Sequence, residues 1–177
     1  MKKNLLTKIS IIILGLIILP VAVTAQKNAP NVPGKNPPNI GTAAGQFSNT
    51  WVEYNMVQNK GKQNEIKGMV IHSQFSVQNA LNDRCQLRAG FYYDNGKALA
   101  GNLTGFKSST GNVVAYKDFT PVNQRTDYSD FQIFVPYAAL NMDAGLAKLK
   151  LQLFLFNYRS NQVFSKSQFV NFTINQK

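Results

Sequence analysis

Beyond residue 46 the chain alternates apolar and polar side chains in short runs, which clusters of Gly, Asn, Asp and Ser separate. In the run 68–77 the polar residues His72, Gln74 and Ser76 fall on one face. The opposite face carries the apolar residues Met69, Ile71, Phe75 and Val77. A repeat of two residues is typical of a strand with one buried face. The pattern therefore predicts a half-buried β-strand here.

The same alternation predicts further strands at residues 51–57, 85–91, 113–119, 130–135, 146–158 and 163–174. Asp94-Asn95-Gly96 provides residues that suit a tight turn after the strand 85–91. A single helical turn is predicted at 136–140, because a proline ends the preceding strand and two alanines favour helix. This spacing predicts an all-β fold, a single antiparallel β-sandwich of about seven or eight strands.

The longest predicted strand, 146–158, has two different faces. One face is wholly aliphatic, with Leu149, Leu151, Leu153 and Leu155. The other face begins with polar side chains and then becomes aromatic, at Phe154, Phe156 and Tyr158. The leucine face is expected to lie in the core.

Phe134 on the strand 130–135 is also an aromatic residue on the face opposite the core, because both of its neighbours, Ile133 and Val135, are apolar and are expected to face the core. Either another segment covers these outward rings, or they form an exposed contact surface. Covering is the commoner arrangement, since proteins seldom leave several adjacent rings in water. If the rings are exposed, the candidate binding residues are Phe134, Phe154, Phe156 and Tyr158.

The N-terminal residues 1–25 have the three parts of a secretory signal peptide: basic residues, an apolar run from Ile9 to Val23, and a small-residue cleavage site ending at Ala25. An uncleaved anchor is the alternative, but Ser10 and Pro20 interrupt the apolar run. Residues 26–45 are rich in Pro, Asn and Gly, which predicts a flexible linker. Residues 46–177 form the predicted domain. The protein is expected to be exported, to the periplasm or outside the cell, with no transmembrane segment after cleavage.

The charge of the chain is strongly basic, with 19 Lys and Arg against eight Asp and Glu. Cleavage of the signal peptide removes three cations and no acid, which leaves a net charge of +8. Such a charge attracts anionic partners over long distances. The lysines are dispersed along the chain, however, and nucleic-acid sites usually concentrate them on one face. Nucleic acid is therefore not an expected partner.

Few residue combinations in the chain could support catalysis. Cys85 and His72 are the only cysteine and histidine, and the alternation places them on faces of opposite polarity, which argues against a catalytic pair and against zinc. Asp94, Asp127 and Asp130 are weak candidates for a calcium site between loops. The sequence predicts no cofactor and no catalytic residue.

Several segments resemble a known bacterial module, a C2-like β-sandwich accessory domain found in multidomain signalling and surface proteins. The resemblance rests on four segments in the module's order: Trp51-Val52-Glu53-Tyr54-Asn55, Gly68-Met69-Val70-Ile71-His72, residues 91–99 and residues 128–140. It implies a C2-like sandwich and no activity. The strand pattern by itself also allows an immunoglobulin-like sandwich.

The sequence therefore predicts an exported, non-enzymatic binding or structural module that contacts another envelope or secreted protein. A calcium-assisted lipid or glycan binder is one alternative. An enzyme with an unrecognised site is another.

Overall fold

The computed structural model describes residues 41–176. The predicted signal peptide, 1–25, and all but the end of the predicted linker, 26–45, lie outside the described residues. The described part consists of eight strands and one short 3-10 helix: β1 (Ala44–Gln58), β2 (Ile66–Gln78), β3 (Cys85–Tyr93), β4 (Val114–Phe119), β5 (Arg125–Pro136), η1 (Tyr137–Leu140), β6 (Gly145–Asn157), β7 (Gln162–Lys166) and β8 (Val170–Gln176).

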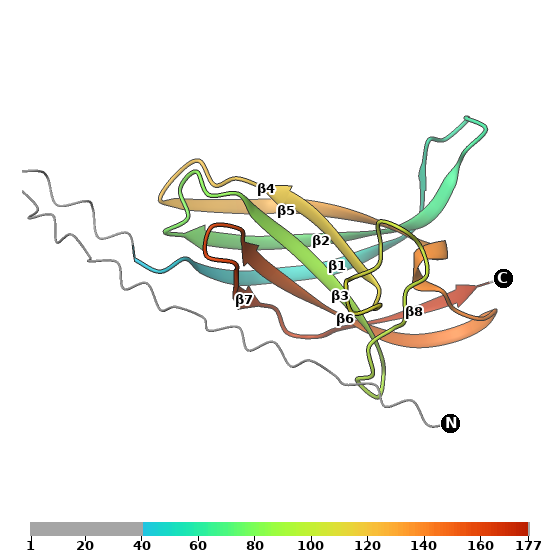
Figure 1. Cartoon of the computed structure of the whole chain (residues 1–177). Helices are drawn as coiled ribbons and strands as arrows, with labels where there is room; N and C mark the ends of the chain where they lie inside the picture. Colours follow the sequence, from blue (N-terminus) through green and yellow to red (C-terminus); the bar gives the residue numbers. More distant parts are fainter. Residues whose placement is uncertain (1–40, 177) are drawn as a thin grey trace, which may run out of the picture. The chain divides into compact units, whose positions relative to one another are not determined.

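The strands form two antiparallel sheets that pack as a β-sandwich (Figure 1). The three-stranded sheet has the order β1-β2-β5, and the five-stranded sheet has the order β4-β3-β6-β7. β8 also pairs with β6, along the half of that strand that precedes its pairing with β7. The predicted fold class is confirmed.

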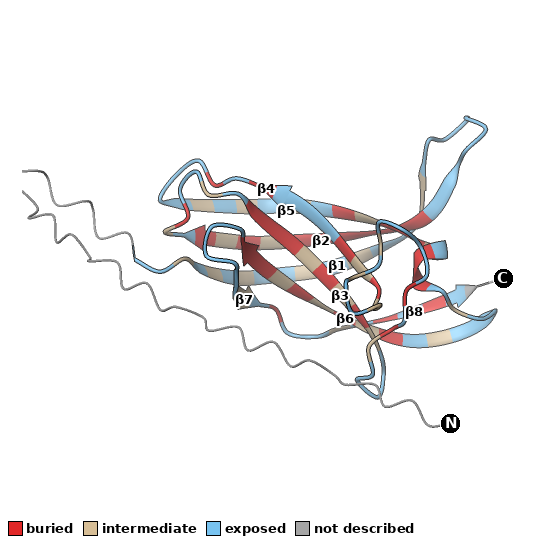
Figure 2. Ribbon diagram, in the orientation of Figure 1, coloured by how far each residue is buried: buried red, intermediate tan, exposed pale blue. Residues whose placement is uncertain are grey.

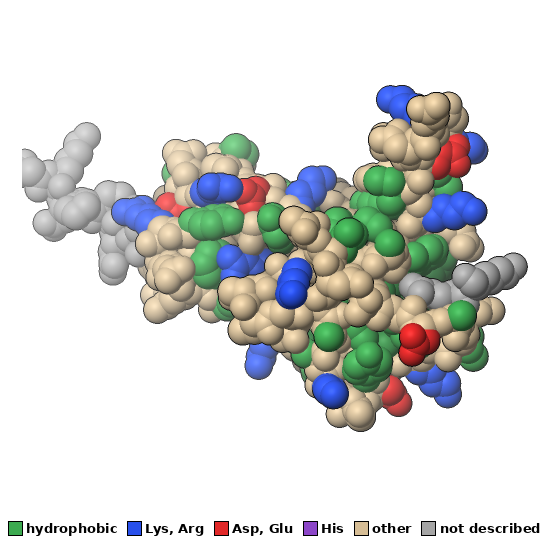
Figure 3. Space-filling model, turned by 45° about the vertical axis from the view of Figure 1, so that its right-hand side comes forward, with side chains coloured by type: hydrophobic (Ala, Val, Ile, Leu, Met, Phe, Trp, Pro, Cys, Tyr) green, Lys and Arg blue, Asp and Glu red, His purple; other side chains and the backbone are tan. Residues whose placement is uncertain are grey.

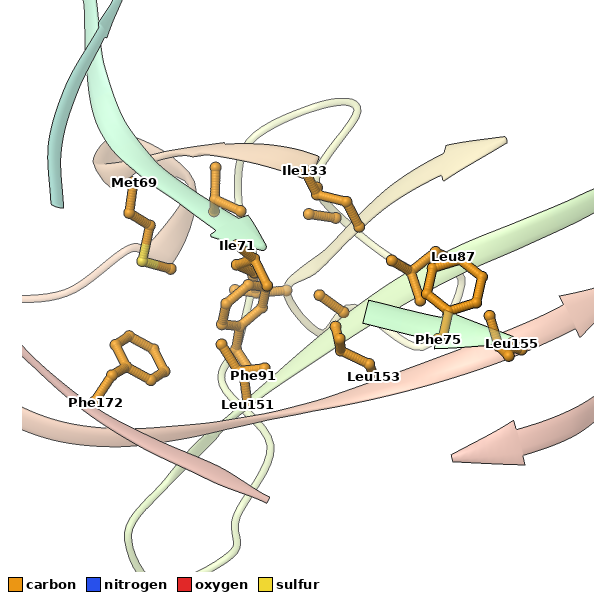
Figure 4. Packing of buried hydrophobic residues seen from close by; sticks show 14 of the residues in the cluster. Met69, Ile71, Phe75, Leu87, Phe91, Ile133, Leu151, Leu153, Leu155 and Phe172 are labelled. Atoms are coloured by element: carbon orange, nitrogen blue, oxygen red, sulfur yellow. The ribbon is translucent and has the colours of Figure 1, made fainter. Parts of the chain in front are cut away.

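The core lies between the two sheets, where the alternating apolar positions of each strand meet (Figure 2). The four leucines of β6 are buried in the core, as the sequence predicts. Figure 4 shows three of them, Leu151, Leu153 and Leu155, in one cluster with Met69, Ile71 and Phe75 of β2. At one end of the core the rings of Phe75, Phe119, Tyr128 and Phe131 pack against one another, with centroids 4.7–5.7 Å apart. Such ring pairs stabilise a core beyond the area that they bury.

The residues predicted as one strand, 163–174, form two strands instead. Ser167 interrupts the run: its backbone amide donates to the carbonyl of Leu153, and its hydroxyl accepts a hydrogen bond from the Leu153 amide, both at 2.9 Å. β7 and β8 therefore pair with different halves of β6. The single helical turn predicted at 136–140 is confirmed as η1, with Pro136 as its N-cap.

The first strand begins earlier than the sequence predicts, at Ala44 rather than 51, and it takes in the last residues assigned to the linker. Gly45 packs closely against β6 and β7, and a Cβ atom there would lie 2.5 Å from a methyl group of Leu155. The domain therefore begins before residue 46. Contacts with distant strands decide this boundary, and polar residues such as Gln46 and Ser48 conceal it in the sequence.

Candidate functional site

The outer face of the five-stranded sheet brings aromatic and cationic side chains together in cross-strand rows. One row runs from β4 to β7 through Asp118, Gln86, Phe156 and Val163. The next row runs through Tyr116, Arg88, Phe154 and Lys166. These side chains point outward because their neighbours in each strand are the buried apolar residues of the core. We call this surface the aromatic face.

Arg88 and Phe156 form the centre of the aromatic face. The guanidinium carbon of Arg88 lies 3.6 Å from the ring centroid of Phe156, so the cation covers the ring. The ring of Tyr158 also packs edge to face against Phe156, at 5.2 Å, and Phe156 is only 8% exposed although it points away from the core. A cation over a ring is attracted by the negative face of the π-system.

Gln86 connects this pair to the neighbouring residues through its buried amide. The Gln86 oxygen accepts a hydrogen bond of 2.6 Å from Nε of Arg88. The Gln86 nitrogen donates two, each 2.7 Å long, to a carboxylate oxygen of Asp118 and to the hydroxyl of Tyr158. Gln86 is only 4% exposed, and both donor hydrogens and the oxygen of its side-chain amide are hydrogen-bonded. A fully bonded buried network fixes the positions of its members.

Asp118 closes the network on the β4 side by pairing with Arg84. Arg84 donates to one Asp118 oxygen from Nε at 3.0 Å and from a terminal nitrogen at 2.5 Å. The same guanidinium lies over the ring of Tyr158, 4.5 Å from its centroid. Desolvation acts to raise the pKa of Asp118, but hydrogen bonds from Arg84 and Gln86 outweigh it and hold the pKa below its usual value.

The face continues toward β8 through Tyr92 and Phe169, whose rings meet edge to face at 5.5 Å. Gly90 makes room for this contact, because a Cβ atom there would lie 3.1 Å from the Tyr92 hydroxyl. Lys150 lies over Phe169, 5.5 Å from its ring centroid. Phe169 is still 49% exposed. Aromatic side chains therefore extend across β3, β6 and the segment before β8.

Basic side chains are distributed among these rings. Arg88, Lys148, Lys150 and Lys166 all belong to the outer positions of this sheet, and Asp118 is the acid of the two central rows. Figure 3 shows one side of the molecule, on which Lys and Arg side chains are scattered between hydrophobic ones. The aromatic face is therefore cationic as well as apolar.

The structure separates the four residues that the sequence offers as a binding patch. Phe154, Phe156 and Tyr158 lie on the aromatic face, but Phe134 lies on the outer face of the other sheet. The four candidate residues therefore do not form one patch. Phe156 is covered, although the side chain of Arg88, on the neighbouring strand of the same sheet, lies over it rather than a separate segment of the chain. Tyr158 remains 39% exposed.

Phe134 instead lines a groove of about 550 Å³ beside the edge strands β4 and β5. Its ring packs against Gly68, where a Cβ atom would lie 2.7 Å from it. Met56, Val70 and Tyr116 add apolar lining, and Lys117 and Gln132 add polar groups. The ring of Phe134 thus serves to pack the three-stranded sheet and to shape this groove.

His72 lies on the outer face of the three-stranded sheet, between two carboxylates. Its Nδ1 is 2.7 Å from Asp130, and its Nε2 is 3.2 Å from Glu53. The ring of Trp51 stacks on the imidazole at 4.8 Å, so that His72 is buried although its face is polar. Hydrogen bonds from Gln132 and then His72 lower the pKa of Asp130. The ring nitrogens are thus already engaged.

The three aspartates considered for calcium lie at different places in the sandwich. Asp94 follows β3 in a turn, Asp127 pairs with Arg125 at 3.1 Å, and Asp130 binds His72. Within residues 41–176, no group of three or more His, Cys, Asp or Glu side chains is placed to hold a metal ion. The structure therefore does not assemble the calcium candidates into one site.

Cys85 is fully buried in the core at the start of β3. Desolvation, with a smaller effect of Asp83, raises the pKa of its thiol to about 11. Only the thiolate is a nucleophile, so the raised pKa and the full burial of the thiol both disfavour attack by Cys85 at neutral pH. The burial agrees with the sequence-based placement of Cys85 on an apolar face.

Sequence reasoning did not single out Gln86, Arg88, Asp118 or Tyr116, which hold the centre of the aromatic face. The polar alternation at Gln86 and Arg88 was visible in the strand 85–91. Nothing in that alternation states that Arg88 lies opposite Phe154 and next to Phe156. The missing information is the register between strands far apart in the sequence.

Comparison with known protein families finds no matching family model, and comparison with curated proteins finds no matching protein. The resemblance to a C2-like accessory domain therefore stays a prediction. Among residues 41–176, no helix is long and apolar enough to cross a membrane.

Proposed function

We propose that this protein is an exported, non-enzymatic binding module that contacts another envelope or secreted protein through its aromatic face. The observation that supports this proposal most directly is the ordered set of arginine and aromatic side chains around Arg88 and Phe156. Arginine and tyrosine are enriched among the residues that dominate binding energy at protein interfaces. A rigid sheet presents them without the cost of ordering a loop.

The residues of the aromatic face are also arranged as in a protein interface. Protein interfaces have a centre in which Arg and aromatic residues are enriched, and a more polar rim. Here Arg88 and Phe156 lie at the centre, whereas exposed Lys148 and Lys166 lie further out. Export is proposed from residues 1–25, whose composition is that of a signal peptide.

The proposal of a non-enzymatic role rests on what the potential catalytic groups already do. The thiol of Cys85 is buried and has a raised pKa of about 11. His72 is held between Asp130 and Glu53 beneath Trp51. Neither group is placed in an open cleft with a free partner, which general acid–base or nucleophilic catalysis requires.

Photo-crosslinking in the native host tests the proposed surface. A photoreactive phenylalanine analogue is placed at Tyr116 or Val163, which are both exposed on the aromatic face, and in a matched variant at Tyr54 on β1. We expect positions 116 and 163 to cross-link to the same protein and position 54 not to do so. Equal cross-linking from all three positions would contradict a binding site on this face.

Substitution of exposed rings provides a second test. The double variant Tyr116→Ser/Phe169→Ser should keep its thermal midpoint within a few degrees of wild type, because both side chains are about half exposed. With the photoreactive analogue at position 163, this double variant should lose the cross-link. The control Tyr54→Ser/Val122→Ser removes two exposed hydrophobic side chains elsewhere and should keep it. If the control loses the cross-link and the first variant keeps it, recognition lies outside the aromatic face.

A further inference from the structure

Arg88 differs from the other arginines of residues 41–176 in its partners. Arg84, Arg125 and Arg159 each form an ion pair with an aspartate. Arg88 forms none within this part of the chain, and its hydrogen bond from Nε goes to the neutral amide of Gln86. Its two terminal nitrogens have no hydrogen-bond partner among the described residues. The guanidinium is thus half-buried, unpaired and still able to donate.

Two contacts fix the orientation of this guanidinium, whereas the side chain of an exposed arginine usually rotates freely. One flat face rests on Phe156 at 3.6 Å, and Nε is tied to Gln86 at 2.6 Å. Gln86 is itself held by Asp118 and Tyr158. A planar fork of N–H groups that is already oriented loses little freedom when it binds a carboxylate. Phe156 and Gln86 therefore hold the guanidinium in one orientation.

The neighbours of Arg88 in its cross-strand row define what surrounds the fork. Tyr116 lies opposite Arg88 on β4 and is 53% exposed. Phe154 lies opposite on β6, and Lys166 follows it on β7. A ligand group at Arg88 would therefore have aromatic side chains on both sides and a second cation nearby.

We propose that Arg88 is the receptor for an Asp or Glu side chain of the partner protein, and that Tyr116 and Phe154 contact apolar side chains flanking that carboxylate. This inference rests on the proposed function, because it names the chemistry by which the aromatic face recognises its partner. A guanidinium binds a carboxylate through two parallel hydrogen bonds, and this geometry gives specificity as well as strength. The surrounding lysines complement an acidic partner surface.

The faces of the aromatic rings are partly covered, which favours a protein carboxylate over an acidic glycan as the ligand. Sugar rings stack on open aromatic faces, but the guanidinium groups of Arg88 and Arg84 already cover faces of Phe156 and Tyr158. Tyr92 and Phe169 meet edge to face rather than as one flat platform. Polyanions such as nucleic acids are bound by rows of free cations. Here Asp118 lies within the central rows and neutralises Arg84.

Titration with sodium acetate, at constant ionic strength, tests the receptor without a known partner. The readout is the NMR signal of each arginine Nε–H. We expect the Arg88 signal to shift saturably with millimolar acetate, while the signals of Arg125 and Arg159 shift only weakly and without saturation. Absence of a saturable shift at Arg88 in the folded wild-type protein would overturn the proposal.

Two variants separate the fork from simple charge. In Arg88→Lys the positive charge stays but the planar fork is lost. We expect the affinity for acetate to fall at least tenfold, as measured from the NMR signals of the backbone amides of residues 86 and 116. Arg125→Lys, a change of the same kind at an exposed ion pair, should leave it unchanged. Equal affinity in Arg88→Lys would show that only charge attracts the anion, against the proposal.

Peptide probes identify the source of the carboxylate. The peptide acetyl-Leu-Glu-Leu-amide should bind at least several-fold more tightly than acetate, and acetyl-Leu-Gln-Leu-amide should show no saturable binding. Tighter binding of a glucuronate oligosaccharide, or of vesicles containing phosphatidylglycerol, than of the glutamate peptide would overturn a protein partner. Acetate binding at Arg88 together with failed cross-linking from the aromatic face would refute the proposed function alone. Cross-linking without acetate binding would refute this inference alone.

Discussion

The stacking of Arg88 on Phe156 should appear as a measurable coupling between the two residues. The double-mutant cycle uses Arg88→Met, which keeps an unbranched side chain but removes the guanidinium, and Phe156→Leu, which keeps apolar volume but removes the ring. Arg88→Met also leaves the buried oxygen of Gln86 without its donor. That loss is common to the single and the double variant, so it cancels in the cycle.

The expected magnitudes follow from the burial of the pair. An unsatisfied buried acceptor costs about 1–3 kcal/mol, and the cation–π contact contributes about 1 kcal/mol, between its values at exposed and desolvated sites. Arg88→Met should therefore lower the free energy of unfolding by about 2–4 kcal/mol. Phe156→Leu should lower it by about 1–2 kcal/mol, because Phe156 is nearly buried but lies outside the central core. The coupling should be about 1 kcal/mol.

Urea unfolding measures all four corners of the cycle. Trp51 is the only tryptophan, and it stacks on His72 within the three-stranded sheet. Its fluorescence therefore reports unfolding from a position remote from the substitutions, which lie in the five-stranded sheet. As a control, Arg125→Met combined with Phe156→Leu should be additive, because Arg125 pairs with Asp127 on β5. If Arg88→Met and Phe156→Leu also add within about 0.3–0.5 kcal/mol, the two side chains do not interact and the proposed preorganisation of Arg88 is refuted.

Three further outcomes are expected. Leu153→Ala should lower the free energy of unfolding by about 2–5 kcal/mol, whereas Lys148→Ala, at an exposed position, should change it little. Equal losses for the two variants in chemical denaturation would mean that the register of β6 is wrong. Cys85 should resist alkylation at neutral pH until the protein is unfolded, since burial raises its pKa to about 11; rapid labelling of native protein would contradict this. The lowered pKa values of Asp118 and Asp130 predict stability that is present above the pKa of an unfolded aspartate, about 4, and that is lost as the pH falls through the folded values. Asp118→Asn should therefore destabilise at neutral pH, and a difference from wild type that does not shrink on acidification would contradict the assignment.

The sequence alone indicated where most of the strands lie and which of their faces are buried. The two-residue alternation placed Leu149, Leu151, Leu153 and Leu155 in the core, and it placed Cys85 inside and His72 on a polar face. This succeeds because side chains alternate across any strand, whatever its partner. The alternation also showed that the second half of β6 is aromatic on its outer face.

Only the tertiary structure decided which outer residues meet. Phe134 and Phe156 both point away from the core, but β5 and β6 belong to opposite sheets, so the two rings lie on different outer faces. Arg88 reaches Phe156 only because β3 pairs with β6 in one particular register. Ser167 divides the last predicted strand only because it meets Leu153. Local alternation determines the face on which a side chain lies, whereas long-range backbone pairing determines its neighbours there.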